Sequence, residues 1–195
     1  MGKINKSRTI TIQSEPIILQ TRIRKLKKNN KKIARTRRQR GYNWEDTIVK
    51  RFNASRNWKA FRLGSPSVAL PDVLAVNNKK SSIFTIEAKS SSTNSVQVPS
   101  DQIQRCLNWT ETFGLYKNRK VILAIKFLSK KWVAPGKYEG RELREFFKVW
   151  DESMSIVDCV CTYNGETFAL ENGKRSKINL KDHSMPFNSK QKITS

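Results

Sequence analysis

The chain has 195 residues, of which 37% are hydrophobic and 28% charged, enough apolar material for one compact domain with an appended segment. Its 39 Lys and Arg outnumber 16 Asp and Glu and give a net charge of +23, so we expect a polyanionic partner. The longest aliphatic run, Val121–Ile125, is far shorter than the ~20 residues of a membrane-spanning helix, so we expect no membrane partner and no secretory signal. Three cysteines, an odd number, fit a reducing cytoplasm better than a disulfide scaffold.

The basic excess is concentrated in residues 1–40, which hold 14 Lys and Arg, a single acid (Glu15) and no aromatic residue. Such a segment buries little apolar surface, so we place a domain boundary near Gly41. We expect residues 1–40 to be a nucleic-acid-binding arm that is either flexible or becomes helical on a phosphate backbone. The alternative is a solubilising or localisation tail. The arginines assigned to nucleic-acid binding are Arg35, Arg37, Arg38 and Arg40.

A helix is predicted to start directly after Asn43, because Asn is a good N-cap and Asp46 stands three residues further on. Its apolar side repeats at a spacing of about four residues, and residues 53–57 end it. The residues that form this side are Trp44, Ile48, Val49 and Phe52.

Alternating or continuous apolar runs predict four strands and one crossover helix in the following segment. The second and third strands form a hairpin around Asn77-Asn78, and a helix capped by Ser100 and stopped by Gly114 precedes the fourth strand. The predicted strands cover residues 58–63, 73–76, 83–89 and 120–127.

The last third predicts a second amphipathic helix and a terminal hairpin. The helix rests on the spacing of Leu143, Phe146, Phe147 and Trp150. The hairpin joins residues 156–163 and 167–170 around Asn164-Gly165. We therefore expect a catalytic or binding domain over 41–170 and a loose polar tail over 171–195.

Two acids and a lysine carry the strongest chemical signal. Asp72 opens one strand of the central hairpin, and Glu87 lies in the middle of the other, where an unpaired buried charge costs several kcal/mol. Because strand residues alternate faces, Lys89 emerges beside Glu87. Carboxylates on adjacent strands suit Mg²⁺, which activates water and neutralises phosphoryl oxygen, while a nearby lysine stabilises the transition state.

Pro71-Asp72 followed by Glu87-Ala88-Lys89 resembles the PD-(D/E)XK nuclease signature. The flanking segments 41–45, 61–65, 98–102 and 121–127 fall in the order seen in archaeal Holliday junction resolvases, and the resemblance covers about residues 41–132. It implies an α/β, restriction-endonuclease-like fold with a mixed central sheet flanked by helices. It also implies a homodimer that nicks four-way DNA junctions in pairs with Mg²⁺ or Mn²⁺ and no small-molecule cofactor, in a cytoplasmic, nucleoid-associated setting.

The resemblance also implies roles for individual residues. Asp72, Glu87 and Glu45 would be metal carboxylates and Lys89 the catalytic lysine. Arg62 would lie near the scissile phosphate and Ser65 in a catalytic loop, while Gln102 would contact DNA. Asp46 departs from the family, which often has arginine there, and its capping role suffices as an explanation.

Other interpretations stay open from the sequence. Glu87 and Lys89 could be an exposed ion pair on an edge strand, and Cys159-x-Cys161 with Cys106 and His183 could hold zinc, although the spacing is wrong for a knuckle. The five tryptophans fit a core or dimer interface better than stacking platforms. The functional alternatives are another nuclease of this superfamily or a catalytically silent nucleic-acid-binding module.

Overall fold

The computed structural model describes residues 15–64 and 69–187, with side chains of 15–30, Lys32 and Arg37 outside the description. The chain forms two compact units, Met1–Gln39 and Arg40–Ser195. Within the described residues no helix is both long enough and apolar enough to cross a membrane.

Helix α1 (Glu15–Ala54) runs without a break through the predicted boundary. The expectation that Asn43 caps a new helix is therefore wrong, and its carbonyl instead accepts a hydrogen bond from Thr47 Oγ1 at 2.6 Å. The physical reason is that Lys, Arg, Gln and Ala, which dominate the preceding segment, are good helix formers, and a single glycine at position 41 costs only about 1 kcal/mol. The predicted apolar side of Trp44, Ile48 and Phe52 is confirmed, since all three are fully buried.

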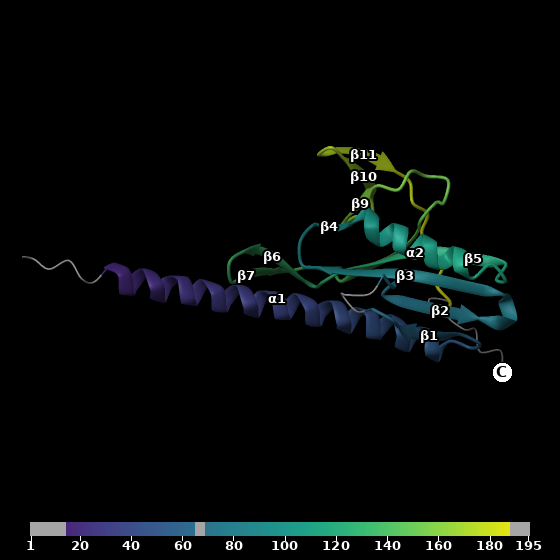
Figure 1. Ribbon diagram of the computed structural model, residues 1–195, viewed down its shortest axis with the longest axis horizontal. Coiled ribbons are helices and arrows are strands. Elements are labelled where there is room, and N and C mark those ends of the chain that lie inside the picture. The colour runs from purple at the N-terminus through teal and green to yellow at the C-terminus, as the bar shows by residue number, and fades with distance from the viewer. Residues whose placement is uncertain (1–14, 65–68, 188–195) are drawn as a thin grey trace, which may run out of the picture. The chain divides into compact units, whose positions relative to one another are not determined.

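The central sheet is mixed, in the order β1-β2-β3-β5-β8. Strands β3 and β5 are parallel and are joined through α2, whereas the other neighbours are antiparallel. This confirms the predicted mixed sheet flanked by helices, drawn in Figure 1. The elements are β1 (Lys59–Arg62), β2 (Val73–Asn77), the short 3-10 helix η1 (Asn78–Lys80), β3 (Ser82–Ser91), α2 (Ser100–Thr112), β5 (Asn118–Phe127) and β8 (Arg144–Val149).

A second sheet has the order β11-β10-β9-β4, and β6 pairs with β7 in a separate hairpin. The hairpin predicted around Asn164-Gly165 is confirmed, and Gly165 (φ 82°) is required there because an added Cβ would meet Phe146 at 2.5 Å. The elements are β4 (Ser95–Val98), β6 (Lys130–Ala134), β7 (Lys137–Gly140), β9 (Asp158–Thr162), β10 (Thr167–Glu171) and β11 (Lys174–Ile178).

Three sequence predictions are corrected by this architecture. The segment around Phe146 and Phe147 is strand β8 rather than a helix, because its two sides face different cores and both need apolar residues. The segment after Asn172 is not loose up to Ile178, since β11 pairs with β10 across the turn at Gly173. Helix α2 does begin at Ser100, but Pro99 occupies the cap position and no side chain caps it.

The central sheet is covered on both faces. Trp44, Ile48 and Phe52 of α1 pack on one face, against Val73, Ile86 and other residues of β2, β3 and β5. On the other face, α2 packs against β5, and Cys159 and Cys161 of β9 join the same apolar cluster. This arrangement makes β3 an interior strand, so a charged residue on it must find partners inside the protein.

The segment after β11 crosses the edge of the central sheet. It runs beside β8, where Val149 N–H donates to the carbonyl of Lys181 at 2.9 Å and His183 N–H donates to that of Phe147 at 2.7 Å. Leu180 belongs to the apolar cluster on the α2 side, whereas Met185 is buried in the cluster on the α1 side. The segment therefore contributes one buried side chain to each of the two apolar clusters.

Candidate active site

Asp72 is fixed where β2 meets β1 and β3. Its Oδ2 accepts a hydrogen bond from the Ala88 N–H at 2.8 Å, and its own carbonyl accepts from the N–H groups of Leu63 at 2.9 Å and Gly64 at 3.3 Å. The antiparallel register that pairs Val73 with Ile86 thus brings Asp72 alongside Glu87, as the hairpin prediction required.

Glu87 is the most buried acid of the site, with a side chain that is 0% exposed. Lys89 Nζ binds its Oε1, and Arg105 Nη2 of α2 lies 3.3 Å from its Oε2. Burial nevertheless raises the pKa of Glu87 to about 7; Lys89 lowers it and Asp72 raises it further. The exposed-ion-pair interpretation is therefore wrong: Glu87 lies inside the protein and is balanced there by two cations.

Glu45 enters the same region from α1. It is buried, and its Oε2 has no hydrogen-bond partner in the described part of the chain. Burial, followed by the negative charge of Asp72, raises the pKa of Glu45 to about 7. The nearest cationic atom is Nε of Arg62, at 3.9 Å from Oε2. An unpaired buried acceptor beside another carboxylate is a position that a cation would stabilise.

Gly64 borders two of these carboxylates. A Cβ built on it would lie 3.3 Å from Asp72 Oδ1 and 3.7 Å from Glu45 Oε2. An alanine there would make a tight contact with Asp72 Oδ1 and an ordinary one with Glu45 Oε2, so the glycine leaves the Asp72 carboxylate uncrowded.

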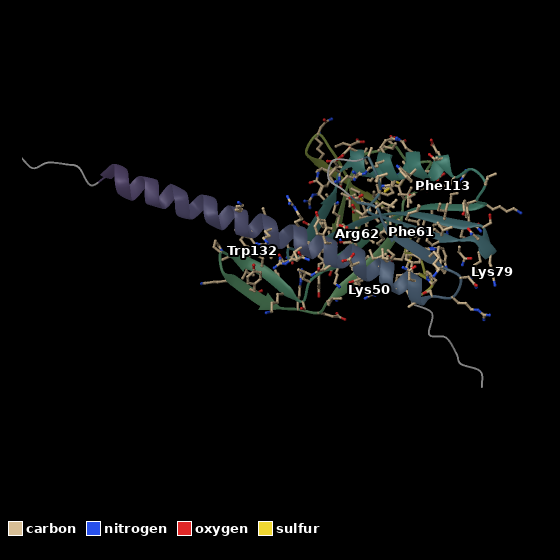
Figure 2. The ribbon with its side chains drawn as sticks, turned by 60° about the horizontal axis from the view of Figure 1, so that its bottom comes forward. Lys50, Phe61, Arg62, Lys79, Phe113 and Trp132 are labelled. Atoms are coloured by element: carbon tan, nitrogen blue, oxygen red, sulfur yellow. The ribbon has the colours of Figure 1, made fainter. Side chains whose placement is uncertain are left out.

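Arg62 closes β1 on the solvent side of the site. Its guanidinium stacks over the ring of Tyr42 at 4.8 Å and lies 3.4 Å from Asp46 Oδ1. Asp46 is thus a partner of Arg62 in mid-helix and not the capping residue that the sequence predicted. The Arg62 side chain remains 36% exposed, and Figure 2 shows it on β1 next to Phe61.

The other predicted site residues are dispersed. Gln102 lies in the first turn of α2, one helical turn before Arg105, and its buried Oε1 has no partner among the described residues. Arg35 and Arg38 are exposed on the part of α1 that belongs to the first unit, whereas Arg40 belongs to the second unit and is half-buried. The predictions for Ser65 and for the Arg37 side chain lie outside the described residues.

Arg105 is the site residue that the sequence did not reveal. It immediately precedes the buried Cys106, on the flank of the apolar side of α2. The one available signal was the crossover itself: a helix that connects β3 to the parallel neighbour β5 lies over β3, and a basic residue beside its apolar face can reach an acid on that strand.

The donor set fits a hard divalent cation. No three His, Cys, Asp or Glu side chains in the described ranges stand close enough together to hold an ion as they are. Yet the three carboxylates lie in one region: Asp72 Oδ2 accepts from the N–H of Ala88, next to Glu87, and Asp72 Oδ1 and Glu45 Oε2 both lie within 4 Å of a Cβ built on Gly64. Carboxylate oxygens are the ligands that Mg²⁺ and Mn²⁺ accept. Because Glu45 Oε2 has no hydrogen-bond partner among the described residues, it could bind an ion without breaking a hydrogen bond.

The structure does not support the alternative zinc site formed by the three cysteines and His183. Cys106, Cys159 and Cys161 are free and buried in the apolar cluster on the α2 side of the sheet. Burial raises the pKa of Cys159 and Cys161 to about 12, which favours thiols over metal-binding thiolates.

The chain matches one protein family model and is similar to solved structures. A family model described as archaeal Holliday junction resolvase matches residues 36–146, more than half of the chain. The solved structure of a Holliday junction resolvase from the archaeal hyperthermophile Archaeoglobus fulgidus is similar at 14% identity and a TM-score of 0.43. That similarity covers 64% of this chain and 85% of the other. No curated protein sequence matches the chain. The resemblance read from the residues and the family match therefore point to the same family.

Proposed function

Because the chain belongs to the archaeal Holliday junction resolvase family, whose members are structure-specific nucleases, we propose that it cuts four-way DNA junctions with a divalent cation at Asp72, Glu87 and Glu45. The observation that carries the proposal is that Asp72, Glu87 and Lys89 lie together at the end of the β2–β3 hairpin, with the unpartnered Oε2 of Glu45 close to Asp72 across Gly64. Mg²⁺ is the expected ion, with Mn²⁺ as a substitute.

The carboxylates would hold the ion, which would lower the pKa of a bound water and neutralise charge on a phosphoryl oxygen. Asp72 is already oriented for this role by the Ala88 N–H. Arg105 of α2 contacts Oε2 of Glu87, and Lys89 contacts the other oxygen, Oε1. Arg105 is thus a positioning residue, because it orients Glu87 and contacts no reacting atom.

Lys89 and Arg62 would act on the phosphodiester. The Lys89 side chain is 24% exposed, so its ammonium group can donate to a phosphate oxygen while it stays next to Glu87. Arg62 is held over Tyr42 and keeps guanidinium N–H groups exposed, which suits it to fix the backbone of the substrate strand. Gln102 remains a proposed contact with the substrate, as does Ser65, which lies outside the described residues.

Paired nicks require two active sites on one junction, and a homodimer supplies them. We propose that branched double-stranded DNA binds across such a dimer and that the basic N-terminal segment adds affinity through phosphate contacts. This assignment follows from the charge of residues 1–40 and needs no sequence-specific base contact.

A substrate panel tests the proposal. Labelled four-way junction, flap, linear duplex and single-stranded DNA of equal length are incubated with the protein in Mg²⁺, Mn²⁺, Ca²⁺ or EDTA. We expect symmetrical nicks in the four-way junction with Mg²⁺ or Mn²⁺, binding with little cleavage in Ca²⁺, and no cleavage in EDTA.

Two outcomes count against it. Cleavage that persists in excess EDTA contradicts the metal-dependent mechanism. Preference for the flap or the duplex over the four-way junction supports a different nuclease of the same superfamily, and binding without cleavage under every condition supports a silent module.

A further inference from the structure

The hairpin of β6 and β7 is fixed close to the candidate active site. Trp132 N–H donates to the carbonyl of Ser92 at 2.7 Å, and Leu128 N–H donates to that of Ser91 at 2.8 Å. Ser92 follows Lys89 by three residues, which is about 10 Å along an extended chain. The root of the hairpin therefore lies at the end of β3 that carries Glu87 and Lys89.

Arg141 holds the root of the hairpin in place. Its Nε donates to the Leu128 carbonyl at 2.8 Å and its Nη2 to the Thr93 carbonyl at 3.1 Å, while its guanidinium lies 4.6 Å from the Tyr163 ring centre. The hairpin beyond this root projects away from both larger sheets (Figure 1, Figure 2).

The hairpin carries two large aromatic side chains that are exposed to solvent. Trp132 and Tyr138 are directly opposite each other in the β6–β7 register, which places them on one face, and they are 43% and 49% exposed. By contrast, Trp44, Trp58 and Trp150 are buried. Of the two predicted places for the tryptophans, a core or a dimer interface, Trp132 is not in a core.

The surroundings of this pair are basic. Lys130, Lys131 and Lys137 lie on the same hairpin, and one acid there, Glu139, is 3.7 Å from Lys131. Two copies of such a hairpin would repel each other, whereas a polyanion would be attracted. Exposed aromatic rings between lysines are the combination that binds nucleobases and phosphates together.

We propose that Trp132 and Tyr138 stack on nucleobases at the branch point of the DNA, next to the scissile phosphates. In a continuous duplex both faces of each base pair are covered by neighbouring pairs, and a branch point is where a base face opens to a side chain. The lysines of the hairpin contact the flanking phosphates. This inference rests on the proposed function, and it adds the means by which the protein distinguishes a branched substrate from a linear duplex.

Binding is measured by fluorescence anisotropy in Ca²⁺ on a four-way junction and on a duplex of equal length, with wild type, Trp132→Ala, Tyr138→Ala and Trp132→Phe. Leu115→Ala is the control, because Leu115 is 96% exposed on another surface. Loss of one base–aromatic stack is worth about 1–3 kcal/mol, so we expect Trp132→Ala to weaken junction binding roughly tenfold. Duplex affinity should stay within about twofold, Trp132→Phe should restore most junction affinity, and the control should match wild type.

Tryptophan emission supplies a readout that is independent of affinity. We expect the junction to quench the emission of wild type more than the duplex does, and the excess to disappear in Trp132→Phe, which lacks that indole. Unchanged junction affinity and selectivity in Trp132→Ala and Tyr138→Ala overturn the inference. A shift of the sedimentation coefficient of these variants toward a smaller species also overturns it, because the pair would then be a contact with a second copy.

Failure of the inference is distinguishable from failure of the proposed function. If wild type cuts four-way junctions and Trp132→Ala cuts and binds them equally well, the hairpin proposal alone is wrong. If wild type neither cuts nor prefers four-way junctions, the proposed function is wrong, and the hairpin proposal falls with it.

Discussion

The two units of the chain use charge in opposite ways. Residues 1–39 carry 13 bases, one acid and no aromatic residue, and the described side chains from Lys31 to Gln39 are exposed. In the unit from Arg40 onward, Glu45 and Glu87 are buried, and cations from β3 and α2 offset the charge of Glu87. An exposed excess of one sign gives long-range attraction that is insensitive to sequence, whereas buried opposite charges give a fixed local geometry. Affinity and chemistry should therefore be separable by mutation.

The largest expected effect is on chemistry. We expect Glu87→Gln and Lys89→Ala to lower the single-turnover cleavage rate at least about 100-fold, since the first removes a proposed metal carboxylate and the second the ammonium proposed to stabilise the transition state. Junction affinity should change little, because it depends mainly on phosphate contacts elsewhere. The controls are Glu111→Gln and Lys79→Ala, which alter exposed residues. A normal cleavage rate in either site variant would remove its residue from the mechanism.

The next effect is on affinity. Lys31→Gln, Arg35→Gln and Arg38→Gln combined remove three exposed bases from the first unit and keep helix-forming residues. If all three contact phosphates, the slope of log K against log salt on duplex DNA should flatten by about 2.7, and cleavage at saturating protein should not change. A matched variant with Lys174, Arg175 and Lys177 of β11 changed to Gln loses the same charge. Equal slopes in the two triple variants would favour the solubilising or localisation role.

A smaller effect is expected from Gly64→Ala. The added Cβ would lie 3.3 Å from Asp72 Oδ1, so this oxygen must give way, and we expect several-fold weaker Mg²⁺ affinity with little change in DNA binding. A Mg²⁺ titration of the cleavage rate measures it. Gly140→Ala is the control, because nothing lies within 4 Å of a Cβ at that position. Unchanged Mg²⁺ dependence would separate Gly64 from the ion site.

The smallest effect is on stability. The pKa of Glu45 is about 7 in the folded protein and near 4.5 when unfolded, so the folded state holds its proton more tightly. The stabilising contribution is complete below pH 4.5 and is lost as the pH rises through 7. In EDTA we therefore expect Glu45→Gln to lie closest to wild type at pH 4.5 and to exceed its free energy of unfolding at pH 8. Urea unfolding at the two pH values measures this difference, and an equal difference at both would show that Glu45 does not titrate in this range.

The sequence predicted the fold where one face of an element dominates the pattern. The α1 side of Trp44, Ile48 and Phe52 and the β2–β3 hairpin are of this kind, and the hairpin carries Asp72, Glu87 and Lys89 into one place. Strand β8 was mistaken for a helix because it is buried on both sides, which erases the two-residue alternation that identifies strands.

Other features depend on partners that are distant in the sequence. Strand β11 was missed because its residues are polar and exposed, and it exists through its pairing with β10. Arg105 was missed because its role depends on how α2 crosses β3. The prediction that a helix starts after Asn43 was wrong because capping preferences show where a helix can begin. They do not show whether the preceding residues are already helical.

The burial of Met185 has a consequence for the order in which the protein folds. Met185 packs in the cluster that contains Trp44, a separation of 141 residues, whereas Asp72 and Lys89 are only 17 apart. Loop closure over such different lengths predicts that the β2–β3 hairpin forms early and that the α1 face is sealed late. Asp72 and Glu87, two of the three proposed ligands, would thus come together before the α1 face next to Glu45 is covered by Met185.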